Sequence, residues 1–112
     1  LAQLFRDVAC ENLNLLFDSQ NYSCMAGLDA APVFAAAGAR VGDFLHVKDG
    51  TDTLGTAPLG TGSSGFLHTL RTIVANGFTG YYILENKYSS LKAAEHEIAA
   101  FREMLRHAAQ QA

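Results

Sequence analysis

Three ionisable side chains stand at the ends of short apolar runs in this sequence. Asp18 and Glu85 each follow such a run directly, and His46 lies one residue before the end of another. Two carboxylates and an imidazole suit a divalent ion such as Mn²⁺, Mg²⁺, Co²⁺ or Zn²⁺. The same residue types also cap loops and form ion pairs, so the pattern alone leaves both interpretations open.

The elements around these side chains determine whether they meet. Short apolar runs bounded by polar residues predict buried strands at 13–17, 41–47 and 81–84. Apolar residues at helical spacing predict helices at 1–9, 29–37, 66–75 and from Ser89 or Ser90 to about His107. This alternation predicts an α/β fold of parallel β/α units with right-handed crossovers. In such a sheet the strand ends share one edge, where ligands bind, so the three side chains are expected to meet there.

Cap and turn residues mark the ends of the predicted elements. Asp29 is the expected N-cap of its helix, and Gly38 is the expected stop. The segment 48–65 contains five glycines and is predicted to be one long loop, of a length that is usually functional or mobile. Its Gly60 and Gly62 are interpreted as turn glycines rather than a phosphate cradle, since a lone Gly-x-Gly is weak evidence.

The composition is that of an ordinary globular chain, expected to form a single segment over 1–112. The 112 residues are 49% hydrophobic and carry a net charge of −3. This mild acidity and the scattered Lys and Arg argue against a nucleic-acid partner. No apolar run approaches the roughly 18–20 residues of a membrane span, and no signal peptide is visible, so we expect a cytoplasmic protein without a membrane partner. Cys10 and Cys24 are expected to be reduced thiols, with a single disulfide as the alternative.

Four segments carry a further pattern in a fixed order along the chain. They are Leu-Leu-Phe-Asp-Ser-Gln-Asn at 15–21, Phe-Leu-His-Val-Lys-Asp at 44–49, Leu-Gly-Thr-Gly at 59–62 and Gly-Phe-Thr-Gly-Tyr-Tyr-Ile-Leu-Glu at 77–85. This pattern resembles the sugar phosphate isomerase/epimerase family, within the xylose-isomerase-like TIM barrel superfamily. The resemblance covers most of the chain, from about residue 13 to 86.

The resemblance implies a (β/α)₈ TIM barrel with one divalent metal ion at its C-terminal face, held by Glu, Asp, His and Glu. By position, Asp18, His46 and Glu85 match three of these ligands, which makes this chain the C-terminal part of the barrel, about strands 6–8. Glu85 also matches a glutamate that moves the substrate proton. Lys48 is a candidate for binding an oxyanion or phosphate, with a salt bridge to the neighbouring Asp49 as the alternative. Asn21 is a candidate substrate contact, with a turn role as the alternative.

Departures from the family pattern leave the substrate open. The first metal-ligating Glu belongs to an earlier strand, which this chain lacks. Asn21 stands where several epimerases have a substrate-binding His, and the segment 50–65 has no Arg, where many members have one. Three strands cannot close a barrel, so the expected partner is the remainder of the barrel or another copy of the chain.

These observations predict a metal-dependent isomerase or epimerase that acts on a sugar, sugar phosphate or polyol through an enediolate. The site is incomplete in this chain alone, which is expected to be inactive in isolation. Two alternatives remain at this point. One is a dehydratase, a lyase built on the same barrel, and the other is a non-catalytic barrel fragment that assembles with copies of itself.

Overall fold

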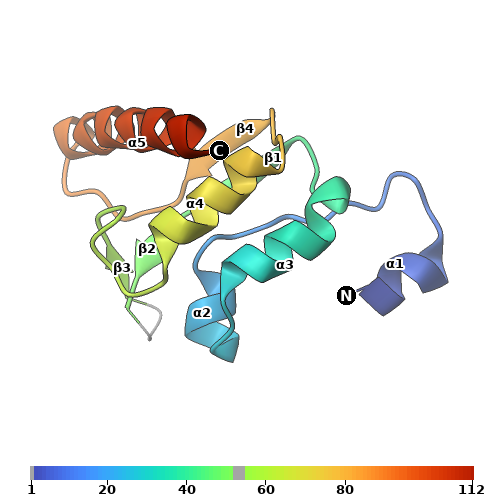
Figure 1. Ribbon diagram of the computed structural model, residues 1–112. Helices are drawn as coiled ribbons and strands as arrows, with labels where there is room; N and C mark the ends of the chain where they lie inside the picture. Colours follow the sequence, from blue (N-terminus) through green and yellow to red (C-terminus); the bar gives the residue numbers. More distant parts are fainter. Residues whose placement is uncertain (1, 52–54) are drawn as a thin grey trace.

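The structure, a computed structural model, describes residues 2–51 and 55–112 of the chain (Figure 1). The helices are α1 (Ala2–Val8), α2 (Asn21–Ala26), α3 (Ala30–Ala37), the 3-10 helix η1 (Gly38–Arg40), α4 (Phe66–Ala75) and α5 (Leu91–Gln111). The strands are β1 (Phe44–Val47), β2 (Asp49–Gly50), β3 (Thr56–Ala57) and β4 (Tyr81–Leu84). None of the described helices is long and apolar enough to cross a membrane.

Parallel strand pairing is the central feature of the fold. β1 pairs in parallel with β4, with Phe44 opposite Tyr81 and Val47 opposite Leu84. The predicted strand 13–17 lies along the other side of β1, but it pairs only through two parallel bridges, Leu15 to Val41 and Asp18 to His46. The expected parallel arrangement is therefore present, with an irregular third member.

The irregularity has a cause in the spacing of the two bridges. Between the bridges the first segment advances from Leu15 to Asp18, whereas its neighbour advances from Val41 to His46. The second segment must therefore accommodate two extra residues. A bulge of this kind interrupts the ladder, and it explains why β1 begins at Phe44 rather than at the predicted residue 41.

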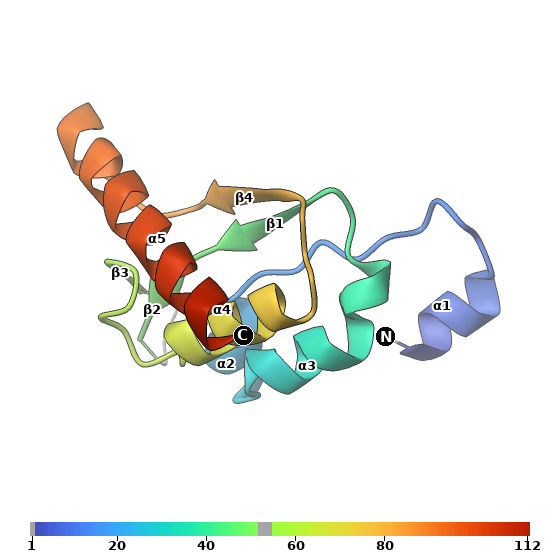
Figure 2. The same ribbon diagram turned by 45° about the horizontal axis from the view of Figure 1, so that its top comes forward.

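The two faces of the paired strands differ in environment, because successive side chains of a strand point to opposite faces. Leu45 and Val47 are fully buried against the helices. Phe44 on β1 and Tyr81 and Ile83 on β4 are exposed on the other face, Tyr81 to 77%. Figure 2 shows β1 and β4 side by side, with α3 and α4 on one side of them only. The core lies between strands and helices and contains Phe17, Phe34, Leu45, Val47, Leu70, Ile73 and Phe101.

Local signals place the helices that cover this core. The Oδ1 atom of Asp29 accepts a hydrogen bond from the N–H of Ala31 at 3.0 Å, so it caps α3 as predicted. Ser90 caps α5 in the same way, through its Oγ atom and the N–H of Ala93 at 3.1 Å. α4 and β4 have the predicted bounds, and α5 continues past His107 to Gln111.

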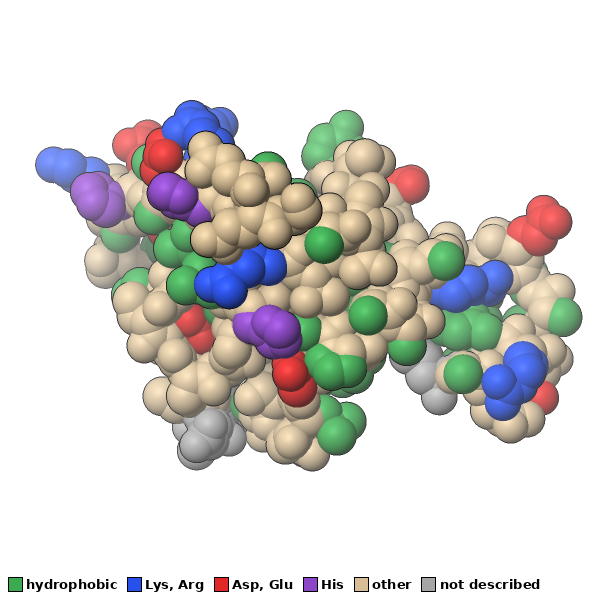
Figure 3. Space-filling view, viewed as in Figure 1, with side chains coloured by type: hydrophobic (Ala, Val, Ile, Leu, Met, Phe, Trp, Pro, Cys, Tyr) green, Lys and Arg blue, Asp and Glu red, His purple; other side chains and the backbone are tan. Residues whose placement is uncertain are grey.

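Helix α1 does not bury the apolar residues whose helical spacing predicted it. None of the residues of α1 is buried, and Leu4 and Val8 are about half exposed. Its described contact with the rest of the chain is made by Arg40, whose guanidinium lies 4.5 Å from the centre of the Phe5 ring. α1 accordingly stands apart from the other helices (Figures 1 and 2). In the space-filling view, acidic and basic side chains are interspersed over the visible face (Figure 3).

Two segments contain regular structure that the sequence did not predict. Residues 21–26 form α2, a helix too short to show a periodic apolar pattern, which ends at Gly27 with a left-handed φ of 62°. The segment 48–65 contains the antiparallel pair β2 and β3, with Asp49 opposite Ala57 and Gly50 opposite Thr56. Residues 52–54 of this segment lie outside the described residues.

Candidate metal centre

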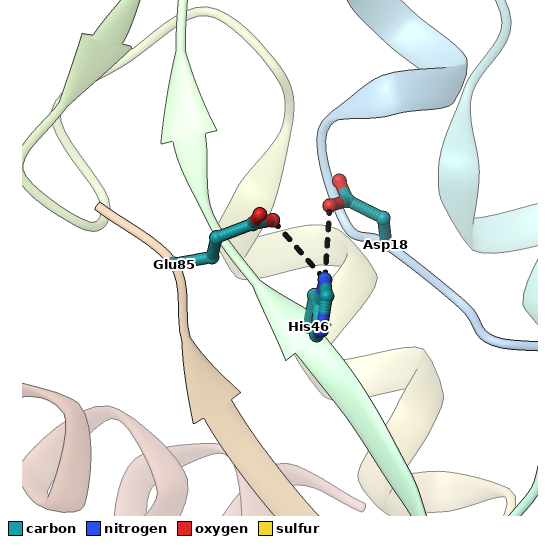
Figure 4. Close-up of side chains that lie close together, drawn as sticks. All are labelled: Asp18, His46 and Glu85. Atoms are coloured by element: carbon teal, nitrogen blue, oxygen red, sulfur yellow. Dashed lines mark ion pairs between the residues drawn. The ribbon is translucent and has the colours of Figure 1, made fainter. Parts of the chain in front are cut away.

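Asp18, His46 and Glu85 meet at the carboxyl ends of the parallel strands, as the strand-end pattern predicted (Figure 4). One ligand atom of each lies within 4.8 Å of the others. The Nδ1 atom of His46 is 3.1 Å from Oε2 of Glu85 and 3.9 Å from Oδ2 of Asp18. These three residues come from three separate segments, so the site is a product of strand pairing.

The register of the strands explains this meeting. The bridge between Asp18 and His46 places these two residues side by side. On the other side, His46 is opposite Ile83, and Glu85 lies two residues further along on the same face. The N–H of Glu85 donates to the carbonyl of Val47 at 3.1 Å, which continues the parallel pairing past the end of β4.

The two carboxylate oxygens of Asp18 have different roles. Oδ1 accepts hydrogen bonds from the backbone N–H groups of Gln20 at 2.8 Å and Asn21 at 2.9 Å, which fixes the carboxylate at the start of α2. Oδ2 is buried and accepts no backbone hydrogen bond. A buried anionic oxygen without a donor is costly unless a cation faces it. The side that faces His46 and Glu85 is therefore the side suited to a positive charge.

Lys48 supplies a positive charge at this position. Its Nζ atom lies 3.2 Å from Oδ2 of Asp18 and 3.5 Å from Oε2 of Glu85. Burial lowers the pKa of Lys48, but the charges and hydrogen bonds of Asp18 and Glu85 together outweigh burial and leave this pKa raised. The ammonium is thus charged at neutral pH, and it pairs with the two candidate ligands rather than with Asp49.

Asp49 instead organises the loop that follows β1. Its Oδ1 accepts from the hydroxyl of Ser64 at 2.6 Å and from its neighbour Gly50 N–H at 2.8 Å. Its Oδ2 accepts from the N–H groups of Gly60 at 2.9 Å and Gly62 at 3.0 Å. A Cβ atom on Gly62 would lie 2.4 Å from Oδ1 of Asp49, so glycine is required there. Both glycines form a turn around a carboxylate of the chain itself, which agrees with the turn interpretation.

Ser19 is a positioning residue that sequence reasoning missed. Its fully buried hydroxyl donates to the carbonyl of Lys48 at 2.7 Å and accepts from the N–H of Lys48 at 2.9 Å. These two bonds continue the parallel pairing between the segment that ends at Asp18 and the segment that contains His46. They do so through a side chain instead of a backbone group. A serine in a polar stretch carries no signal for such a contact, because its partner is remote in the sequence.

Asn21 and Cys24 belong to α2, which follows Asp18 directly, and Asn21 has a simpler role in the described contacts. Asn21 opens α2, and its backbone N–H helps hold Asp18. Tyr22 stacks on Phe17, and its pKa is raised by burial and, to a smaller degree, by the charge of Asp18. Both cysteines are free thiols, so the disulfide alternative is not formed.

The donor set fits a divalent ion. Two carboxylates and one imidazole nitrogen match the ligands of Zn²⁺, Mn²⁺ and related ions, and the buried Oδ2 of Asp18, which faces the ammonium of Lys48, lies on the side where a cation would be held. Within the described residues the cluster has three members, one fewer than the four ligands of the family pattern.

Comparison with known proteins supports the fold. No protein-family model matches the chain, and no match is found among the curated proteins. Among solved structures, the chain is similar to the crystal structure of a xylose isomerase domain protein from Planctomyces limnophilus, with a TM-score of 0.76 and 20% sequence identity. The alignment covers 98% of this chain and 42% of that one, so the chain spans about two fifths of its length. The chain therefore has an α/β fold similar to part of a xylose isomerase-like domain.

Proposed function

We propose that this chain carries the metal-binding edge of a sugar or sugar-phosphate isomerase or epimerase. The observation that carries the proposal is the meeting of Asp18, His46 and Glu85 at the carboxyl ends of parallel strands, in a fold similar to part of a xylose isomerase-like domain. Ligand sites of parallel β/α folds lie at this edge. The family resemblance of the four sequence segments points to the same chemistry.

In this proposal Asp18, His46 and Glu85 hold one divalent ion, Mn²⁺, Mg²⁺, Co²⁺ or Zn²⁺. Such an ion polarises a substrate carbonyl and stabilises negative charge on the substrate oxygens. The backbone N–H groups of Gln20 and Asn21 orient Asp18 for this task. His46 presents Nδ1 to both carboxylates, so this nitrogen is the ligand atom.

Glu85 is the proposed acid/base. Its side chain is 52% exposed, which leaves it accessible to a substrate, whereas that of Asp18 is only 8% exposed. A Glu85 oxygen takes the proton from the carbon next to the substrate carbonyl, and the electron pair left behind forms an enediolate. Glu85 then delivers this proton to the former carbonyl carbon, and the proton of the neighbouring hydroxyl moves to the former carbonyl oxygen, which completes an isomerisation. An epimerase requires a second acid/base on the opposite face, and in this proposal the remainder of the barrel supplies it.

Lys48 and Asn21 are the proposed substrate contacts. The ammonium of Lys48 lies among the ligands and would attract an oxyanion or a phosphate of the substrate. Asn21 lies at the first turn of α2, directly beside Asp18, where its side chain is partly exposed.

The proposed setting for these residues is the C-terminal part of an eight-stranded barrel. The exposed sheet face of Leu16, Phe44, Tyr81 and Ile83 is then the inside of the barrel, covered by further β/α units. Copies of the chain alone do not fit this architecture, because three strands per chain do not divide into eight. We therefore favour the remainder of one barrel as the partner, and it would also supply the fourth ligand.

Native mass spectrometry of the full chain with Mn²⁺, Co²⁺ or Zn²⁺ tests the site first. We expect one ion per chain in the wild type and binding weakened more than about tenfold in Asp18→Asn, with Glu95→Gln, an exposed carboxylate on α5, as a matched control. With the rest of the barrel present, deuterium from solvent should enter the substrate next to its carbonyl. A new conjugated chromophore would instead identify the dehydratase. Metal-free chains that form defined oligomers would support the non-catalytic alternative.

A further inference from the structure

We propose that Lys48 is a built-in counter-ion of the metal site, which a divalent ion must displace from the carboxylates in order to bind. This inference rests on the proposed function, because it concerns the same three ligands. It adds a competition between a side chain of the protein and the metal ion. It also gives an order to binding, with the metal ion first and an anionic substrate group second.

The first argument is that Lys48 uses the same oxygen atoms as the metal ion would. Its ammonium faces Oδ2 of Asp18 at 3.2 Å and Oε2 of Glu85 at 3.5 Å. These two oxygens are also the ones that face Nδ1 of His46, at 3.9 Å and 3.1 Å. A metal ion would approach them to about 2.0–2.2 Å, and its double charge would repel an ammonium on the same atoms. Both cations cannot keep these contacts together.

The second argument is charge balance. The side chain of Asp18 is only 8% exposed, and its buried Oδ2 has the ammonium of Lys48 as an ionic partner but accepts no backbone hydrogen bond. The nearby Glu85 adds a second negative charge to the same site. Without a cation, these carboxylates would repel each other in a partly buried place. Lys48 removes this cost in the metal-free chain, so its present position is explained without a substrate.

The third argument is that hydrogen bonds fix the backbone of Lys48, whereas its tip is held by the two carboxylates for which the metal ion competes. Ser19 binds both the N–H and the carbonyl of Lys48, and this fixes the start of the side chain beside Asp18. The four-carbon stem beyond that point has several rotatable bonds, so the ammonium can swing away while the backbone stays in place. A displaced ammonium remains within a side-chain length of the metal ion. There it is available to a negatively charged substrate oxygen.

Two measurements on the full chain test the competition. The first compares Mn²⁺ affinity by titration calorimetry in the wild type, Lys48→Met and Lys48→Arg, with Lys87→Met as the control two residues beyond Glu85. We expect Lys48→Met to bind Mn²⁺ roughly tenfold more tightly, a coupling of ordinary size. Lys48→Arg keeps the competing charge, so its affinity should stay near that of the wild type, as should the affinity of Lys87→Met.

The second measurement needs only the wild type, so it does not depend on the folding of a variant. Lysine amines are labelled with a succinimidyl ester, with and without saturating Mn²⁺, and the labelled peptides are quantified by mass spectrometry. We expect labelling of Lys48 to rise several-fold when Mn²⁺ binds, while Lys87 and Lys92 stay unchanged. This readout reports movement of the amine itself and not activity.

The outcomes separate this inference from the metal site on which it rests. If the wild type binds Mn²⁺ but Lys48→Met binds no more tightly, or Lys48 labelling does not rise, the competition is refuted and the metal site stands. If neither the wild type nor Lys48→Met binds Mn²⁺, both the competition and the metal site are refuted. If Lys48→Met binds Mn²⁺ and the wild type does not, the competition is supported in its strongest form.

Discussion

Replacement of Asp49 by asparagine tests how the loop beside the candidate metal centre is held. The native carboxylate is 1% exposed and accepts four hydrogen bonds, two on each oxygen. An asparagine has the same shape but only one oxygen. The less costly orientation of the asparagine side chain places its NH₂ group where Oδ1 of Asp49 was, because the Ser64 hydroxyl at that position can turn and accept a hydrogen bond. The N–H of Gly50 then has no acceptor.

The size of the effect follows from these contacts. A buried donor without an acceptor costs about 1–3 kcal/mol. The two bonds from Gly60 and Gly62 lose their ionic partner, and a charge-assisted bond is stronger than a neutral one by about 1 kcal/mol. We therefore expect Asp49→Asn to lower the free energy of unfolding by about 3–5 kcal/mol, a large part of the roughly 5–15 kcal/mol of a typical domain.

Urea unfolding followed by circular dichroism measures this change. A loss of this size shifts the midpoint by about 1–3 M at an unchanged slope. Asp43→Asn is the matched control, because this carboxylate is exposed and its replacement should change the stability by less than about 0.5 kcal/mol. A loss below about 1 kcal/mol for Asp49→Asn, or one equal to that of the control, would refute the reasoning.

Three further predictions concern the site and its surroundings. Asp18→Asn should weaken Mn²⁺ binding more than about tenfold, since it removes one ligand charge; unchanged calorimetric affinity would contradict its role as a ligand. Ser19→Ala removes both bonds to Lys48 and should cost about 1–3 kcal/mol in urea unfolding, whereas a cost near zero would show that these bonds do not hold the strand end. The pKa of Tyr88 is raised by burial and by its bond to Glu97, so the folded state keeps this proton more tightly than the unfolded chain. The stability that it contributes is complete below about pH 10 and is lost above it, so Tyr88→Phe should flatten the fall in urea midpoint between pH 9 and 11.

Local sequence patterns predicted much of the fold. The apolar stripe of Phe66–Ala75 and the run Tyr81–Leu84 gave the bounds of α4 and β4, because each element is specified by its own residues. Asp29 and Ser90 were found as caps for the same reason, since a cap binds a backbone group only two or three residues away. α2 was missed because its six residues are too few to show a periodic apolar pattern.

The same distinction between local and remote contacts applies to the candidate site. The sequence by itself determined which residues approach each other, since Asp18, His46 and Glu85 follow apolar strand segments, and parallel strands bring their ends to one edge. Only the tertiary structure decided that Lys48 pairs with the two candidate ligands and Asp49 with the loop glycines. Neighbours in sequence point to opposite faces of a strand, so the partners of these two charged residues depend on segments that only folding brings beside them.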